Sequence, residues 1–103
     1  MQLLTEIWGL AKKRYNLTVV TPSLIKVSTN EFTARTLHKG QSDYYIILVS
    51  KKTSITTDIL VHEIAHIVAF ERPDLGAVGH NTEYMDILYT LEADVREETD
   101  GSK

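Results

Sequence analysis

Residues 62–66 read His-Glu-Ile-Ala-His, which places two histidines four positions apart with a glutamate directly after the first. On an α-helix, residues four apart differ by only about 40° around the axis, so both imidazole rings can reach one metal ion. Neutral imidazole is a preferred ligand of zinc. Zinc lowers the pKa of a bound water to about 7, and a carboxylate beside it can take up the proton. The pattern therefore predicts a zinc site with His62 and His66 as ligands and Glu63 as general base.

The surroundings of this motif favour a metal site over a chance match. The segment from Ile55 to Phe70 is apolar on nearly all sides, which predicts a buried helix that Pro73 stops and that Thr53 or Ser54 caps. Buried polar side chains are costly unless they have partners. Two histidines and a glutamate on such a helix therefore indicate a functional site.

A catalytic zinc usually has three protein ligands and one open position. The metzincin pattern is excluded, because Ala69 and Arg72 stand where it requires glycine and histidine. His80 follows His66 after thirteen residues that include two glycines, and a loop of this length can fold back to the metal. We expect His80 to be the third ligand of one zinc ion per chain. Glu83 is the alternative ligand, although a glutamate in the first turn of a helix is also favoured by the helix dipole.

The elements around the motif predict an α+β fold with an N-terminal helix, a small, mainly antiparallel three-stranded sheet, the motif helix and a C-terminal helix. Apolar spacing predicts the first helix over Leu3–Tyr15 and the last from Asn81 or Thr82 onward. Tyr44–Ser50 is an almost continuous apolar run, typical of a central strand covered on both faces. The remaining strands are expected at Thr18–Ser28 and Phe32–His38, with a turn over Lys39–Asp43.

A length of 103 residues suits one domain, so residues 1–103 are expected to form a single unit with 97–103 as a flexible tail. The absence of cysteine excludes disulfides, thiolate ligands and a cysteine nucleophile, and it favours a reducing compartment. No segment approaches the roughly 20 apolar residues of a membrane span, and the N-terminus does not have the pattern of a signal peptide. We therefore expect a cytoplasmic protein with no membrane partner.

Charge is distributed unevenly along the chain. Residues 1–52 carry eight basic and three acidic side chains, whereas residues 53–103 carry three basic and eleven acidic ones, and the total is −3. A divalent cation would offset part of the negative charge around the motif. The overall balance gives no support for strong DNA binding, and the cations Lys12, Lys13 and Arg14 suit the last turn of their helix.

The motif and the segment that follows it resemble the SprT-like zinc metallopeptidases, the group that includes Spartan. The resemblance rests on His62–His66 and on Gly79-His80-Asn81-Thr82-Glu83-Tyr84, and it covers roughly residues 44–90. It implies that His62, His66 and His80 bind zinc and that Glu63 is the general base. It also implies an association with DNA, but the zinc ribbon or DNA-binding region of many members has no counterpart in this sequence.

Several other residues are candidates for supporting roles. Asp58 precedes His62 by one turn and could orient its ring, or it could simply favour the start of the helix. Tyr84 could stabilise an oxyanion, although its position in an apolar stripe favours core packing. The sequence does not choose among His38, Tyr44 and Tyr45 as side chains that line the site. Trp8 is expected to be a core or interface aromatic.

These observations together predict a zinc peptidase that cleaves a protein or peptide substrate. By analogy with other H-E-x-x-H peptidases, and not from the residues themselves, the substrate is expected to add as a strand at the edge of the sheet. One alternative is an amide hydrolase with a non-protein substrate. Another is a metal-binding interaction module without turnover, although such a module would have no need of Glu63.

Overall fold

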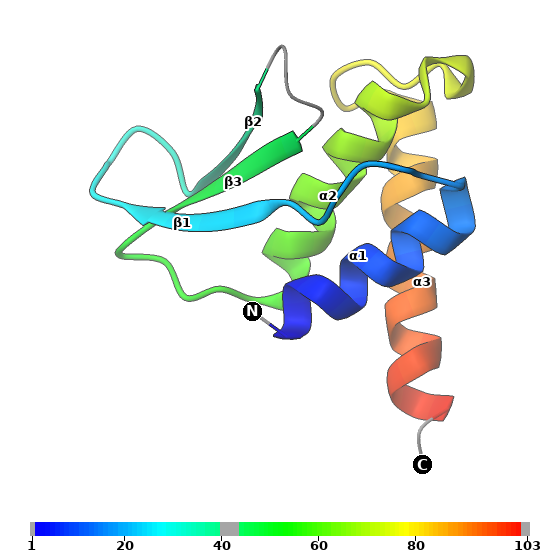
Figure 1. Ribbon diagram of the computed structural model, residues 1–103, viewed down its shortest axis with the longest axis horizontal. Coiled ribbons are helices and arrows are strands. Elements are labelled where there is room, and N and C mark those ends of the chain that lie inside the picture. Colours follow the sequence, from blue (N-terminus) through cyan, green and yellow to red (C-terminus); the bar gives the residue numbers. More distant parts are fainter. Residues whose placement is uncertain (1, 40–43, 102–103) are drawn as a thin grey trace.

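The computed structural model describes residues 2–39 and 44–101, and it arranges them as helix, three strands and two further helices (Figure 1). The elements are α1 (Gln2–Tyr15), β1 (Ser23–Val27), β2 (Ala34–Lys39), β3 (Tyr44–Ser50), α2 (Thr57–Glu71), a short 3-10 helix (Pro73–Leu75) and α3 (Thr82–Gly101). This layout confirms the expected α+β class. Within the described residues, no helix combines the length and the apolar character needed to cross a membrane.

The sheet is mixed and has the strand order β1-β3-β2. β2 pairs with β3 in the antiparallel direction, whereas β1 pairs with β3 in the parallel direction. The expectation of a mainly antiparallel sheet therefore holds for one of the two pairings. The chain reverses after β1 and again after β2, and β3 then inserts between them in the direction of β1. Most of the turn expected over Lys39–Asp43 lies outside the described residues.

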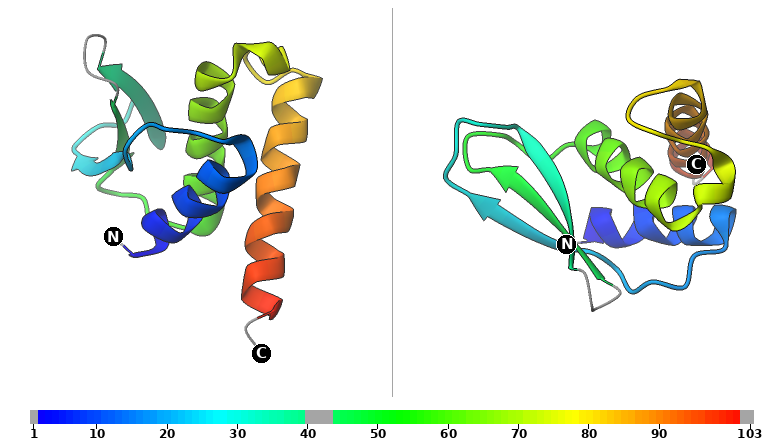
Figure 2. Two further views of the ribbon diagram at one scale, coloured as in Figure 1. Left: turned by 45° about the vertical axis from the view of Figure 1, so that its right-hand side comes forward. Right: turned by 90° about the horizontal axis from the view of Figure 1, so that it is seen from above.

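β3 is the central strand, as its apolar sequence predicts, but only one of its faces is fully covered. Tyr45, Ile47 and Val49 are buried, whereas Tyr44, Ile46 and Leu48 on the other face are only half-buried. Figure 2 shows the reason, because all three helices lie on one side of the sheet. The expectation that β3 is covered on both faces was wrong. A continuous apolar run does not by itself show whether a second layer exists.

The strand expected over Thr18–Ser28 is confined to Ser23–Val27. Pro22 has no backbone N–H and directly precedes the strand, so the ladder starts after it. The residues before it run as an extended connection in which Leu17 and Val19 still reach the core. β2 is displaced by only one or two residues from its expected position.

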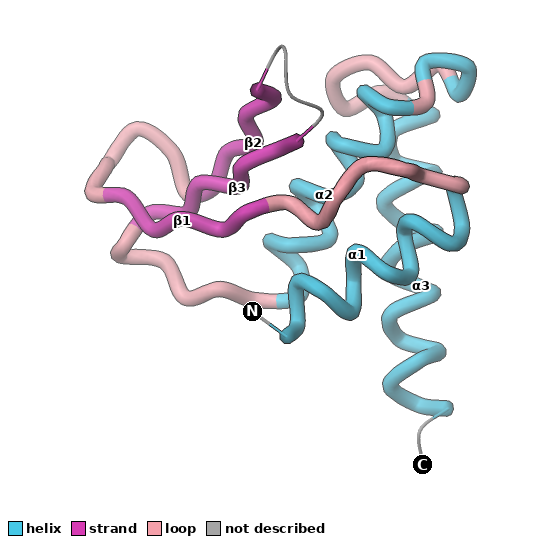
Figure 3. Tube along the Cα trace, viewed as in Figure 1, coloured by secondary structure: helices cyan, strands magenta, loops and turns pink. Residues whose placement is uncertain are grey.

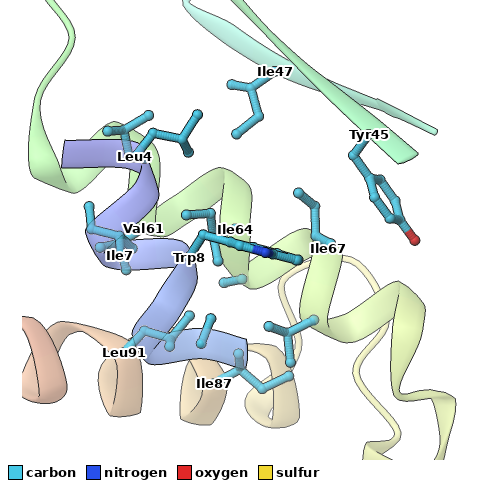
Figure 4. Close-up of a cluster of buried hydrophobic side chains, with 14 of the residues drawn as sticks. Leu4, Ile7, Trp8, Tyr45, Ile47, Val61, Ile64, Ile67, Ile87 and Leu91 are labelled. Carbon is cyan, nitrogen blue, oxygen red and sulfur yellow. The ribbon is translucent and has the colours of Figure 1, made fainter. Parts of the chain in front are cut away.

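α2 packs between the sheet and α3, with α1 beside both helices (Figures 1 and 3). Its buried side chains meet those of the other elements in one cluster, which Figure 4 shows around Trp8 and Ile64. Trp8 is only 2% exposed, so of its two expected roles, core or interface, it has the core one. The same cluster includes Ile7 of α1, Ile47 of β3 and Leu91 of α3, so one apolar core holds α2 in place.

The start of α2 differs slightly from the expected position, whereas its end is close to it. The side-chain oxygen of Thr56 caps the helix by accepting a hydrogen bond from the backbone N–H of Ile59, so the cap is not at Thr53 or Ser54. The helix ends at Glu71, two residues before Pro73, in agreement with the expected stop. α3 continues to Gly101, so residues 97–101 of the expected tail have a helical backbone, and Ser102 and Lys103 lie outside the described residues.

Candidate metal centre

His62 and His66 lie one turn apart on the side of α2 that is not packed into the core. Their side chains are half-buried, and their Nε2 atoms are 3.2 Å apart. This convergence follows from the helical spacing of four residues. The helix therefore presents both ring nitrogens to the same point in space.

His80 reaches the same point from the loop between the 3-10 helix and α3, which curves back beside the C-terminal half of α2 (Figure 3). Its Nε2 atom lies 3.2 Å from Nε2 of His66. Two glycines allow the loop to turn, because Gly76 and Gly79 adopt positive φ angles of 76° and 57°. His80 thus joins the cluster although it is distant from the motif in sequence.

Asn81 fixes the loop that carries His80. Its side-chain oxygen accepts hydrogen bonds from the backbone N–H groups of Tyr84 and Val78, at 2.9 and 3.2 Å, and so caps α3. Its side-chain amide donates to the carbonyl of Gly76 at 3.1 Å. The residue next to His80 is therefore bonded both to the helix and to the loop, which limits where the histidine can lie.

The three histidines fit the requirements of a zinc ion. One ligand atom from each of His62, His66 and His80 lies within 4.8 Å of the others. Nitrogen ligands of a tetrahedral zinc, at about 2.0–2.1 Å from the metal, lie about 3.3–3.4 Å from one another. The two Nε2 separations of 3.2 Å are close to that value. A neutral imidazole carries one N–H, so Nε2 of His66 cannot satisfy both neighbours as a hydrogen-bond donor, whereas one cation satisfies all three nitrogens.

Glu63 is buried, at 5% exposure, and its two carboxylate oxygens have different surroundings. Oε1 accepts a hydrogen bond of 2.7 Å from the hydroxyl of Thr36 on β2. Oε2 lies 4.0 Å from Nε2 of His62, on the side of the histidine cluster. One oxygen is thus held by the sheet while the other faces the place where the metal would lie. Sequence reasoning missed Thr36, because a threonine on a short strand carries no motif that indicates a role.

Tyr84 is completely buried and contacts two of the histidines. Its ring stacks on that of His66, with centroids 4.5 Å apart, and its hydroxyl donates to the carbonyl of His62 at 3.0 Å. Burial raises the pKa of the hydroxyl far above its usual value. Core packing, the favoured expectation, is confirmed, and the hydroxyl is already engaged with backbone and is not directed at a substrate oxygen.

Two carboxylates that the sequence suggests as partners of the metal site, Glu83 and Asp58, are not bonded to the histidines in the described part of the chain. Glu83 is exposed and lines a surface hollow with Tyr15 and Leu75, apart from the histidine cluster. Asp58 is exposed in the first turn of α2, and within the described part of the chain no hydrogen bond connects it to His62. His80, and not Glu83, is therefore the residue that the fold brings to His62 and His66.

A cleft of about 550 Å³ opens between β2 and α2 and contains the three histidines and Glu63. Thr36 and His38 line it from β2, and Tyr45 from β3. Of the three ring residues that the sequence left open, His38 and Tyr45 thus line the cleft. Tyr44 belongs to the opposite face of the sheet, because successive residues of a strand point to opposite sides.

The metal-free protein is expected to lose stability when it is acidified. Burial, followed by the neighbouring His62 and His80, lowers the pKa of His66 to about 4. An unfolded chain would bind a proton at this histidine near its ordinary pKa of about 6.5, so between about pH 6.5 and 4 acid favours the unfolded state. The free energy of unfolding should therefore fall as the pH drops through this window. Urea unfolding at pH 7.5 and 5.0, in the presence of a chelator, measures the change.

His66→Gln is the matched variant for this measurement, because the amide does not titrate. We expect the variant to lose less stability than the wild type between the two pH values. An equal loss in both proteins would contradict the assigned cause.

Comparison of the chain with models of known protein families, with curated proteins and with solved structures found no match. The resemblance to SprT-like metallopeptidases therefore depends on the residues of the motif and of the segment around His80.

Proposed function

We propose that this protein is a zinc-dependent metallopeptidase of the H-E-x-x-H class, similar to the SprT-like enzymes. His62, His66 and His80 would hold one zinc ion, and Glu63 would act as general base. The observation that carries the proposal is the convergence of three Nε2 atoms beside a buried carboxylate with one oxygen directed toward them. A site that only binds metal needs the histidines but has no use for this carboxylate.

Zinc, when bound, supplies Lewis acidity that activates water and polarises a carbonyl group. Glu63 then has two tasks. Its Oε2 takes a proton from the water whose oxygen attacks the scissile carbonyl carbon, and it passes this proton to the leaving nitrogen as the C–N bond breaks. Thr36 keeps Oε1 occupied, so the carboxylate presents Oε2 to the reaction in one orientation.

The position of β2 supports a peptide as the substrate. The strand order makes β2 an edge strand, and the same strand lines the cleft beside Glu63 and the histidines. An extended peptide can pair with the free backbone groups of such an edge, which brings its own carbonyl groups past the site. Neighbouring strands lie about 4.8 Å apart, so a peptide beside β2 would lie over the cleft.

DNA association receives less support than peptide cleavage. In the cationic cluster at the end of α1, Arg14 is engaged in a two-pronged ion pair with Asp94 of α3, at 2.6 and 2.9 Å. This ion pair partly neutralises one positive charge of the cluster, which would otherwise be available to a phosphate group. We therefore include a protein or peptide substrate in the proposal and leave any targeting to DNA to a partner.

Reconstitution with metal tests the proposal. Chain freed of metal with a chelator and then supplied with one equivalent of zinc should cleave unfolded proteins such as casein, with fragments identified by mass spectrometry. The chelated protein should be inactive and should recover when zinc is returned. Zinc-loaded protein that cleaves neither casein nor a diverse peptide mixture would contradict a peptidase function.

A further inference from the structure

One apolar side chain in the cleft is unusually exposed. Phe70 follows His66 by one turn of α2 and is 59% exposed, although phenylalanine is normally buried. The other large apolar side chains that are well exposed in the described part of the chain (Val20, Ile25, Val78 and Tyr89) do not line the cleft. The exposed ring therefore lies beside the proposed reaction site and not on an unrelated surface.

Two further rings extend this apolar surface into the cleft. His38 stacks on Tyr45 with centroids 4.7 Å apart, and it lies 4.7 Å from Phe70 in a tilted arrangement. Tyr45 is buried, and its hydroxyl donates to the carboxylate of Glu71, so its ring is held in place. Figure 4 shows Tyr45 at the margin of the core cluster, away from α1 and α3. The three rings form a wall that is fixed at its base and open at Phe70.

This wall lies at a defined distance from the proposed reaction site. Thr36, which holds Glu63, and His38, which belongs to the wall, are two residues apart on the same face of β2. That spacing corresponds to about 7 Å along a strand. A peptide paired with β2 would therefore place a side chain close to the scissile bond against His38 and Phe70.

The chemistry of the wall selects among side chains. Aromatic rings attract one another in offset or edge-to-face arrangements with centroids about 4.5–7 Å apart, and His38, Tyr45 and Phe70 already show this geometry. Among the described residues that line the cleft, Glu63 is the only carboxylate, and the carboxylate of Glu71 beside the wall accepts a hydrogen bond from the hydroxyl of Tyr45. An incoming ring would cover the exposed face of Phe70 and remove it from water.

We infer that His38, Tyr45 and Phe70 form a subsite that binds an aromatic side chain of the substrate next to the scissile bond. The inference rests on the proposed peptidase function, since it assigns the substrate preference of the same cleft. Phe70 is the specificity-determining residue, because its ring is the part of the wall that remains open to a ligand.

Binding of two small hydroxamates to the zinc-loaded full chain tests the subsite without the need for turnover. Acetohydroxamate offers only the metal-binding group, whereas phenylacetohydroxamate adds one aromatic ring. Calorimetry should show about 10-fold or tighter binding of the aromatic compound to the wild type. Phe70→Ala should remove most of this preference and leave the affinity for acetohydroxamate unchanged.

Tyr89→Ala provides the matched control, because Tyr89 is equally exposed, at 59%, but lies on α3 outside the cleft. It should keep the full preference, and His38→Ala should weaken the preference as a second change in the wall. Equal affinity of the wild type for both hydroxamates, or equal loss of both in Phe70→Ala, would overturn the subsite alone. Failure of the wild type to bind zinc or acetohydroxamate would instead overturn the proposed function on which the subsite rests.

Discussion

Replacing Glu63 by glutamine is expected to lower the rate of peptide hydrolysis by about 10²–10⁴-fold, the usual contribution of a general base, and to leave zinc binding unchanged. Glutamine has nearly the shape of glutamate, and its carbonyl oxygen can still accept the hydrogen bond from Thr36. The fold and the three histidines should therefore be preserved. The amide cannot take a proton from water, so only the chemical step is removed. Cleavage of casein by zinc-loaded protein, together with its metal content, measures both effects.

The same variant separates an enzyme from an interaction module. If the chain only binds metal and a partner, Glu63→Gln would leave its function untouched. Any cleavage seen with the wild type would then come from a contaminating peptidase and would persist in the variant. Thr36→Val adds a graded comparison, because it removes the hydrogen bond to Oε1 but keeps the carboxylate. We expect a loss of about 10-fold in kcat for Thr36→Val, the equivalent of one hydrogen bond, and recovery with Thr36→Ser.

Removing the ring of His80 is expected to weaken zinc binding by more than about 100-fold, since loss of only an outer hydrogen-bond partner of a ligand already costs 10–100-fold. The change to alanine leaves two histidines on α2 and opens the site on the side of the loop. His80 is exposed and Asn81 holds the loop on its own, so the fold should tolerate the substitution. Competition with a chromophoric zinc chelator measures the affinity.

Glu83→Ala is the control for this prediction, because the sequence alone makes Glu83 the rival third ligand. The structure places it in a different hollow, so the variant should bind zinc as tightly as the wild type. Weaker binding in Glu83→Ala together with full binding in His80→Ala would contradict the arrangement described for the site.

The parts of the fold that the sequence predicts well are those with a strong local pattern. The helix that carries His62 and His66 and the central position of the strand over Tyr44–Ser50 both follow from apolar patterns, and the structure agrees with both. The apposition of the two histidines is equally local, since it requires only a helix. The approach of His80 was expected from loop length, and the positive φ angles of Gly76 and Gly79 provide the turn.

The parts that the sequence does not predict depend on contacts between distant segments. The hydrogen bond from Thr36 to Glu63 joins residues 27 positions apart, and it exists because β2 packs against α2. The parallel pairing of β1 with β3 depends on the strand order of the sheet, and the half-covered outer face depends on the packing of all three helices on one side of it (Figure 2). Local patterns of apolar residues are compatible with either strand order.

The candidate site shows the same division between local and distant effects. The sequence identifies which residues could bind metal but leaves His80 and Glu83 as alternatives, and only the path of the loop places His80 beside His66. It also leaves His38, Tyr44 and Tyr45 equivalent, whereas strand alternation in the folded sheet directs only His38 and Tyr45 into the cleft.

If three histidines of one chain hold a zinc ion, the purified protein should bind a fixed amount of zinc. The chain should be stripped with a chelator, supplied with excess zinc, passed over a desalting column and analysed by inductively coupled plasma mass spectrometry. We expect about one zinc ion per chain, the number that three convergent imidazoles can hold. A folded wild-type protein that retains no zinc after this treatment would contradict the metal site and, with it, the hydrolase.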